Sequence, residues 1–196
     1  MAEDKRTLLE LLVEEFQRDR NILLLGEVNE EMAIRTMLLL RKFDRDDPDE
    51  PIYLYINSPG GSVIDGLSII DNMALIHAPV YTVVVGMAAS MGAVIFSCGE
   101  KGHRYMLENS QLMIHQPWRS MQSAMKESDM AAAAEEMTNK RRKLEKILQR
   151  NSKISLEEMH RACELDNYLD SDEALEMGLC DHVIQSNKTG LVEPNK

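Results

Sequence analysis

The chain has 196 residues, of which 33 are acidic and 22 basic, so its formal charge is −11. This charge, together with the lack of any stretch of Lys and Arg long enough to follow a phosphate backbone, excludes nucleic acid as an expected partner. Hydrophobic residues make up 44% of the chain and aromatic residues only 5%, so we expect aliphatic side chains and the 14 methionines to fill one core.

The cysteines and the hydropathy pattern indicate a cytoplasmic protein with no membrane partner. Cys98, Cys163 and Cys180 are too few and too far apart for a familiar zinc pattern, and their odd number disfavours a disulfide framework. The N-terminus mixes acidic and apolar residues, which is not typical of a signal peptide. The longest apolar runs are far shorter than the roughly 20 residues of a membrane span. We therefore expect no metal and no cofactor.

The first half of the chain predicts alternating helices and strands. Leu8, Leu12 and Phe16 recur every four residues, which predicts an amphipathic helix over 7–19. The segments expected to follow are a strand at 22–25, a helix from the cap Asn29 toward Phe43, an acidic loop at 44–51, a strand at 52–56, a sharp turn at 58–62, a helix at 63–77 and a strand at 81–85. Such alternation is typical of an α/β fold with parallel strands.

The second half begins with a helix near Ser90 and ends in a polar tail. The expected elements are short strands at 104–107 and 112–114, a helix at about 125–151, a helix at 156–163 with a Ser155 and Glu158 capping box, and a last helix at 172–177 capped by Ser171 and ended by Gly178. The long helix exceeds the usual globular length, so we expect it to project and to pack partly against another subunit. Its basic cluster at 140–143 predicts a solvated helix face. We expect one domain at 1–185 and a polar C-terminal tail at 186–196.

Ser90 is a candidate nucleophile because Gly86, Ala88, Ala89 and Gly92 surround it with small residues that allow close backbone approach. A serine at the start of a helix is more often a simple N-cap, and the sequence around Ser90 weakens that interpretation only modestly.

His115 is the best placed of the five histidines to act as a base. It follows the apolar run 112–114 and precedes a proline, which places it at the end of a buried strand, where α/β active sites gather. A structural histidine is an equally good interpretation of the position alone. The Gly60 and Gly61 pair is consistent either with a strand-to-helix turn or with a backbone amide that binds an oxyanion.

Three motifs together closely resemble the proteolytic subunits of the Clp protease. They are Tyr53-Leu54-Tyr55-Ile56-Asn57-Ser58-Pro59-Gly60-Gly61-Ser62, Gly86-Met87-Ala88-Ala89-Ser90-Met91-Gly92-Ala93 and Met113-Ile114-His115-Gln116-Pro117. They occur in the order of that family and near its spacing, and the resemblance covers about residues 22–184.

The resemblance implies a crotonase-like α/β fold of repeated ββα units with a projecting long helix. It implies a homo-oligomer of two stacked heptameric rings that hydrolyses unfolded polypeptides without using ATP itself, beside an AAA+ unfoldase that does. Ser90 matches the nucleophile, His115 the general base and Asp166 the residue that orients the imidazole. The backbone amides of Gly61 and Met91 match the oxyanion donors, and Tyr53 and Tyr55 match an apolar pocket that receives an unfoldase loop.

This chain departs from the family pattern at three places. It starts at its first expected helix, without the usual axial-loop segment, so we expect an atypical member with a shortened N-terminus. The stretch Trp118 to Ser123 replaces a glycine-rich segment that pairs with extended substrate, and Leu165 stands where an Arg for ring-to-ring ion pairing is usual. These changes put gating, peptide binding and ring contacts in question.

Two other functions compete with an active peptidase subunit. One is a catalytically idle or regulatory ring subunit that assembles with an active paralogue. The other is acyl-CoA chemistry on the same fold, which is disfavoured because that chemistry does not need this Ser, His and Asp combination.

Overall fold

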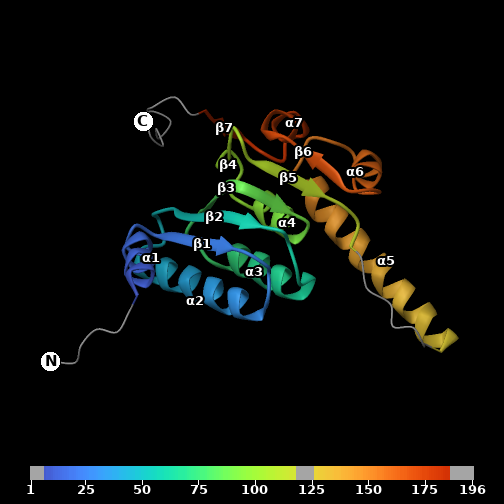
Figure 1. Ribbon diagram of the computed structural model, residues 1–196, viewed down its shortest axis with the longest axis horizontal. Helices are drawn as coiled ribbons and strands as arrows, with labels where there is room; N and C mark the ends of the chain where they lie inside the picture. Colours follow the sequence, from blue (N-terminus) through green and yellow to red (C-terminus); the bar gives the residue numbers. More distant parts are fainter. Residues whose placement is uncertain (1–6, 118–125, 186–196) are drawn as a thin grey trace.

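The computed structural model describes residues 7–117 and 126–185. Its sheet has seven strands, and its main path runs β1 (Asn21–Leu25), β2 (Ile52–Ser58), β3 (Val80–Ala89), β4 (Arg104–Leu107) and β7 (His182–Ile184). All neighbours on this path are parallel (Figure 1). A side branch pairs β5 (Gln111–Ile114) with β3 in parallel, and β6 (Asn167–Leu169) with β5 in antiparallel order.

Strand β3 changes its partner along its length. Residues 82–84 pair with β4, whereas residues 87–89 pair with β5. Gly86 lies between the two stretches with φ of 88°, a backbone conformation that glycine adopts at little cost. The carboxyl end of β3, which leads directly to Ser90, therefore sits between β2 and β5.

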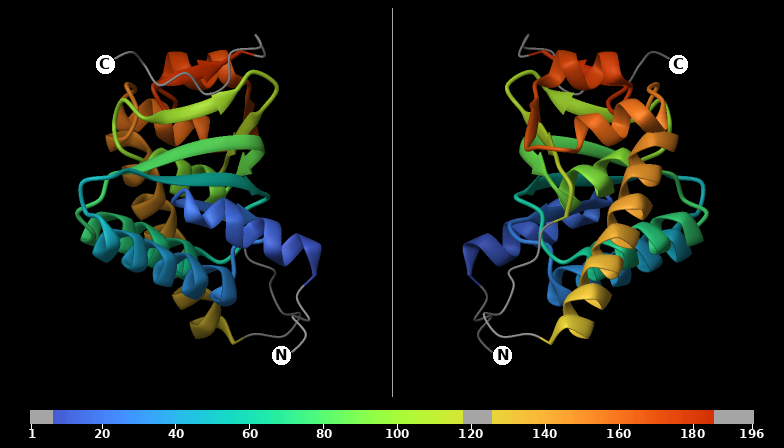
Figure 2. Two further views of the ribbon diagram at one scale, coloured as in Figure 1. Left: turned by 90° about the vertical axis from the view of Figure 1, so that its left-hand side faces the viewer. Right: turned by 90° about the vertical axis from the view of Figure 1, so that its right-hand side faces the viewer.

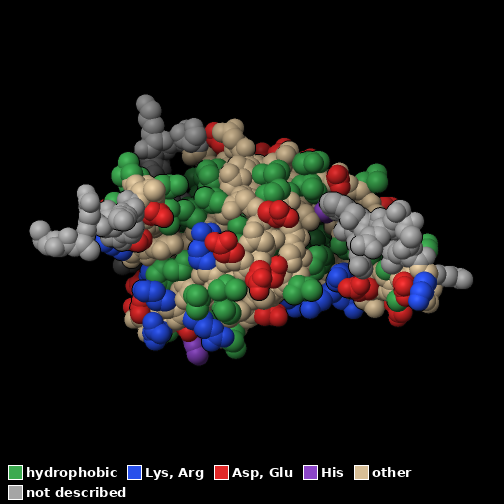
Figure 3. Space-filling model, turned by 60° about the horizontal axis from the view of Figure 1, so that its bottom comes forward, with side chains coloured by type: hydrophobic (Ala, Val, Ile, Leu, Met, Phe, Trp, Pro, Cys, Tyr) green, Lys and Arg blue, Asp and Glu red, His purple; other side chains and the backbone are tan. Residues whose placement is uncertain are grey.

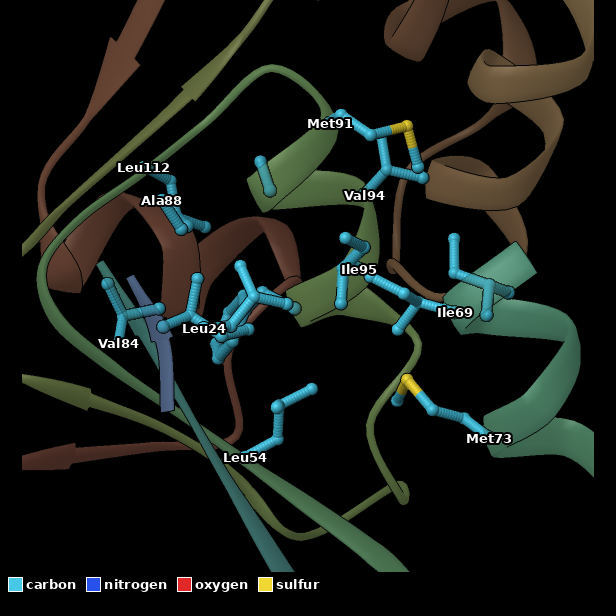
Figure 4. Packing of buried hydrophobic residues seen from close by; sticks show 14 of the residues in the cluster. Leu24, Leu54, Ile69, Met73, Val84, Ala88, Met91, Val94, Ile95 and Leu112 are labelled. Carbon is cyan, nitrogen blue, oxygen red and sulfur yellow. The ribbon is translucent and has the colours of Figure 1, made fainter. Parts of the chain in front are cut away.

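Helices α2 (Glu30–Asp46) and α3 (Val63–Leu75) lie side by side along one face of the sheet, and α4 (Met91–Ser97) follows β3 on the same side (Figures 1 and 2). Figure 4 shows apolar side chains of β1, β2, β3, α3 and α4 converging there. Phe96, Leu24, Leu54, Ile69 and Met91 are among the fully buried ones. Burial of this kind contributes about 25 cal/mol per Å² of apolar surface, so the core fixes α4 firmly.

The remaining helices lie at the edges of this core. Helix α1 (Leu8–Arg18) has no buried residue, and α5 (Glu127–Arg150) runs past the sheet and projects from the body (Figure 1). Only the C-terminal part of α5 is packed inward, through Leu144, Ile147 and Leu148. Helices α6 (Leu156–Ala162) and α7 (Ser171–Met177) complete the C-terminal region.

The mixed α/β architecture agrees with the expected fold class, but several element details differ. Helix α2 continues to Asp46, and the carboxylate of Asp44, placed in a loop from the sequence, accepts the amides of His77 and Ala78. The cap of α7 is Asp170 rather than Ser171, because the Asp170 carboxylate accepts two amides of the first turn. Strands β6 and β7 were not predicted. The Trp118 to Ser123 stretch and the tail at 186–196 lie outside the described residues.

Candidate active site

Ser90 occupies a strained turn between β3 and α4. Its φ of 52° and ψ of −119° place an L-residue where glycine is usual, at a cost on the order of 1–3 kcal/mol. The turn is held by a 2.8 Å hydrogen bond from the Ser90 amide to the Met113 carbonyl. Ser90 is at the N-cap position of α4, but its hydroxyl makes no capping bond. The simple helix-cap interpretation is therefore wrong, and the hydroxyl is left for another partner.

Gly60 packs directly against this turn. A Cβ atom on Gly60 would lie 2.7 Å from Ser90 Cβ and 2.8 Å from the Ala89 carbonyl oxygen, and the φ of Gly60 is 95°. Both facts require glycine here. The glycine pair thus brings the loop after β2 against the nucleophile turn.

The structure brings Ser90, His115 and Asp166 into one hydrogen-bonded row. His115 follows β5, as expected for the end of a buried strand, and its side chain is only 11% exposed. Its Nε2 lies 2.9 Å from Ser90 Oγ, and its Nδ1 lies 2.9 Å from Asp166 Oδ1. Asp166 precedes β6, and its side chain is 62% exposed. This geometry suits proton transfer from a hydroxyl to an imidazole that a carboxylate orients.

The other four histidines have their own partners away from Ser90. His77 lies 3.9 Å from Asp44, and His103 contacts the Tyr105 hydroxyl at 3.1 Å. His160 lies 3.0 Å from Glu145, and His182 lies 2.9 Å from the Gly102 carbonyl oxygen. Among the described residues, His115 alone meets the candidate nucleophile.

Two backbone amides border the serine. Met91 is the first residue of α4, so its amide has no acceptor inside the helix. Gly61 forms an isolated parallel β-bridge with Val28. The hydrogen bonds of this bridge join the Val28 amide to the Gly60 carbonyl and the Ser62 amide to the Val28 carbonyl, so the Gly61 amide takes no part in them. Both Gly61 and Met91 line the same cavity as Ser90.

That cavity of about 480 Å³ opens beside the row of three side chains. Its apolar wall includes Met91, Val94, Met113, Leu144, Leu148 and Cys163. Burial, and then the charge of Glu145, raise the pKa of the Cys163 thiol to about 12, so this thiol is neutral and behaves as part of the apolar wall. An apolar group next to a reacting carbonyl would find a mainly apolar recess there.

Sequence reasoning missed a polar cluster on the same wall. Arg141 was expected on a solvated face, but its side chain is 21% exposed and its Nε donates to the buried Glu145 carboxylate at 2.7 Å. Arg141 also donates to Gln116 at 2.9 Å. The solvated-face prediction is wrong for this residue because α6 and the segment after β5 cover that side of α5. The four-residue spacing of Arg141 and Glu145 was the available signal.

The tyrosines lie apart from this cavity, on the sheet. Tyr53 packs edge-to-face on Tyr81 with ring centroids 5.4 Å apart, and Tyr55 lies 5.2 Å from the Phe16 ring of α1. Burial, with a smaller contribution from Tyr53, raises the pKa of Tyr55. Leu165, beside Asp166, is 80% exposed.

The described ranges, 7–117 and 126–185, contain neither a candidate membrane span nor a candidate metal site. No helix there is long and apolar enough to cross a membrane, and no group of three or more His, Cys, Asp or Glu side chains could hold a metal ion.

The profile of a family described as Clp protease matches residues 4–187. Two proteins named ATP-dependent Clp protease proteolytic subunit, from Streptococcus pneumoniae strains Hungary19A-6 and CGSP14, are each 46% identical to the chain over 170 residues. The match covers 87% of this chain and 87% of each relative.

Proposed function

The chain belongs to the Clp protease family, and from that premise we propose how its residues carry out peptide hydrolysis. It is a serine protease subunit of a Clp protease, with the fold of that family. The family generally forms oligomeric rings that work with Clp ATPases. The roles of individual residues and the details of assembly are our proposal.

Ser90 is the nucleophile, His115 the general base and Asp166 the orienting carboxylate. Nδ1–H of His115 donates to Asp166, which leaves Nε2 free to accept the Ser90 proton as Oγ attacks the substrate carbonyl. The imidazolium then gives that proton to the leaving amine, and water hydrolyses the acyl-enzyme by the reverse sequence. The observation that carries this proposal is the pair of 2.9 Å contacts of His115 with Ser90 and Asp166.

The amides of Gly61 and Met91 stabilise the oxyanion. An oxygen that becomes negative beside Ser90 needs donors aimed at it before the reaction begins, and loss of one such donor costs about 10²- to 10³-fold in rate. The Met91 amide at the start of α4 supports this role, since the helix dipole adds positive potential there.

We further propose two stacked heptameric rings, an AAA+ unfoldase partner that supplies unfolded polypeptide, and a cytoplasmic location. Large apolar side chains that stay exposed on the single chain support assembly, among them Leu8, Leu9, Leu38 and Ile64. On the face shown in Figure 3, hydrophobic side chains form several groups between charged ones. Tyr53 and Tyr55 are proposed to contact the unfoldase loop.

The test uses the assembled protein, a short fluorogenic peptide and a fluorophosphonate that labels reactive serines. We expect hydrolysis and labelling in the parent, and neither in Ser90→Ala, with the same assembly mass for both. A Ser90→Ala variant that hydrolyses peptide at the parent rate would show that another residue is the nucleophile. An assembled parent that neither hydrolyses nor labels would contradict the proposal as a whole.

A further inference from the structure

Gln116, the residue after His115, connects three separate segments of the chain. Its amide donates to the Cys163 carbonyl at 2.7 Å, and its side-chain Nε2 donates to the Glu164 carbonyl at 2.8 Å. Its Oε1 accepts from Arg141 Nη1 at 2.9 Å. Gln116 thereby fastens the end of β5 both to the segment that leads to Asp166 and to α5.

The segment that leads to Asp166 has little packing of its own beyond Cys163. Leu165 and Asp166 are both largely exposed, and neither belongs to a helix or strand. Exposed side chains contribute little to holding a backbone in place. On the C-terminal side of Asp166, Asn167 pairs with Ile114 in the antiparallel ladder of β5 and β6. The two hydrogen bonds from Gln116 hold the segment on the N-terminal side of Asp166, so the ladder and Gln116 together set where Asp166 stands relative to His115.

Arg141 holds the side chain of Gln116, and Glu145 holds Arg141. The planar guanidinium donates through Nε to Glu145 Oε1 at 2.7 Å while Nη1 donates to Gln116. Glu145 is 6% exposed, and His160 of α6 lies 3.0 Å from its second oxygen. A buried carboxylate with two such neighbours is fixed in one position. Only an arginine fork reaches both acceptors at once with directed donors.

We propose that Arg141 and Glu145 are positioning residues that fix Gln116 and, through it, the contact between His115 and Asp166. We call Gln116, Arg141 and Glu145 the Gln116 clamp. This inference rests on the proposed function and adds to it. The clamp affects the relative positions of Ser90, His115 and Asp166. Because Arg141 and Glu145 belong to α5, the position of the packed part of α5 affects this geometry.

The clamp also lines the cavity beside Ser90, so a substrate-binding role is the competing explanation. The two explanations differ in kinetics. Loss of a positioning contact lowers kcat and leaves KM nearly unchanged, whereas loss of a uniform substrate contact raises KM and leaves kcat unchanged.

The decisive variant is Arg141→Lys in the full-length protein. Its ammonium keeps a positive charge beside Glu145, so the buried carboxylate is not left unpaired. A single ammonium on a flexible side chain does not, however, reproduce the two directed hydrogen bonds to Glu145 and Gln116. We expect kcat for a short fluorogenic peptide to fall about ten- to hundredfold. KM, assembly mass and thermal midpoint should stay close to those of the parent.

A second variant, Arg141→Met with Glu145→Met, removes both charges together and leaves no charge unpaired. It should show the same loss of kcat. The matched control is Arg161→Gln on α6, which removes an exposed ion pair with Glu157. Within the described part of the chain, the Arg161 side chain has no hydrogen bond or ion pair with a member of the clamp. It should match the parent in every measurement.

Parent kcat in Arg141→Lys, or a raised KM with unchanged kcat, would overturn the clamp while leaving the proposed function intact. Loss of kcat together with loss of assembly mass in both variants would assign the pair a structural role, which also overturns it. A parent without Ser90-dependent hydrolysis would overturn the clamp and the proposed function together.

Discussion

Ser90 and Asp166 lie on opposite sides of His115, and different forces hold them. Ser90 follows a central strand, its turn is bonded to Met113 through the backbone, and α4 behind it is buried along its whole length. Asp166 stands between β6, which pairs with β5, and an exposed segment that hydrogen bonds from the Gln116 side chain and amide hold to the body. The position of Ser90 thus depends on core packing, and the position of Asp166 depends on backbone pairing and a few polar contacts. Substitutions on the two sides should therefore separate activity from stability differently.

Asp166→Asn should separate activity from stability most strongly. An amide at this position can donate to Nδ1 of His115 and so favours the tautomer that cannot accept the Ser90 proton, which should lower kcat by roughly 10³- to 10⁴-fold. The free energy of unfolding should change by less than about 0.5 kcal/mol, because the side chain is exposed. Peptide hydrolysis and thermal unfolding measure the two effects.

Asp172→Asn, which changes an exposed carboxylate in the first turn of α7, is the control. It should keep the parent kcat and lose at most about 1 kcal/mol of stability through the helix dipole. A kcat for Asp166→Asn within tenfold of the parent would show that Asp166 contributes little to the reaction. The contrast between the supports of Ser90 and Asp166 would then have no consequence for activity.

Gly60→Ala should damage activity and stability together. The new Cβ would meet Ser90 Cβ and the Ala89 carbonyl, so the nucleophile turn must shift. A displacement of about 1 Å costs on the order of 10²-fold in rate, and overpacking costs about 1–3 kcal/mol. Enzyme kinetics and denaturant unfolding on the same samples test this.

Gly26→Ala isolates the backbone part of that effect. Gly26 has φ of 84°, close to the 95° of Gly60, but a Cβ there would have nothing within 4 Å. Both variants place an alanine at a positive φ, which destabilises the fold, and only Gly60→Ala adds a steric clash with the Ser90 turn. Equal losses in the two variants would mean that contact with Ser90 is unimportant.

Arg104→Met should affect stability alone. The buried guanidinium donates to the carbonyl oxygens of Ser97, at the end of α4, and Gly178, and it pairs with Asp181 at 2.6 Å. It also donates to the Asn151 carbonyl. Removing it leaves three carbonyls without this donor and a partly buried carboxylate without its charged partner, at a cost of about 3 kcal/mol. We expect the folded fraction to keep its kcat within about twofold, because the row of three side chains is untouched.

Equilibrium unfolding in denaturant measures this loss, with Arg161→Gln as the exposed-pair control at less than about 1 kcal/mol. A large drop in kcat of folded Arg104→Met would indicate that the C-terminal end of α4 adjusts the nucleophile, so the core would be less rigid than we infer.

Low pH should reduce the stability that the Arg104 and Asp181 pair contributes, by a smaller amount than Arg104→Met does. Partial burial alone would raise the pKa of Asp181, but hydrogen bonds and charge from Arg104, with the amides of Gly102 and Arg104, outweigh it and lower the pKa. A carboxyl group with a lowered pKa in the folded state stabilises the fold above its unfolded pKa of about 3.9, and this contribution is lost as pH falls toward the lowered value.

The thermal midpoint between pH 7 and pH 3 should therefore fall less steeply in Asp181→Asn than in the parent, although the variant starts lower. Parallel curves for the two proteins would show that the Arg104 and Asp181 pair carries none of the acid sensitivity.

Local signals predicted most of the fold. Apolar periodicity gave the helices and central strands to within a few residues, because burial on one face imposes it directly on the sequence. Strands β6 and β7 have three residues each, and each forms only by pairing with a distant strand, so no local pattern indicates them. Asp170 and Ser171 are both good capping residues, and the sequence gives no basis for choosing between neighbours.

The candidate site was predictable for a different reason. Ser90 by itself was better explained as a helix cap, and the resemblance to a family, rather than spacing, selected it with His115 and Asp166. The geometry that brings them together is a property of the folded chain. Arg141 was misjudged because its burial depends on contacts with Gln116 and α6 that lie far away in the sequence.

Because α5 is packed only near its C-terminal end, a small rotation of the helix moves its outer part much farther than its packed part. The stretch from Glu127 to Lys140 lies beyond the buried residues that anchor the helix, and at 1.5 Å per residue it reaches about 21 Å. A tilt of about 5° at the anchored end would carry the tip through about 2 Å, a displacement several times larger than the one at Arg141 itself. A distance probe attached near Met130 would therefore report small rotations of this helix that the interatomic distances around Ser90 scarcely record.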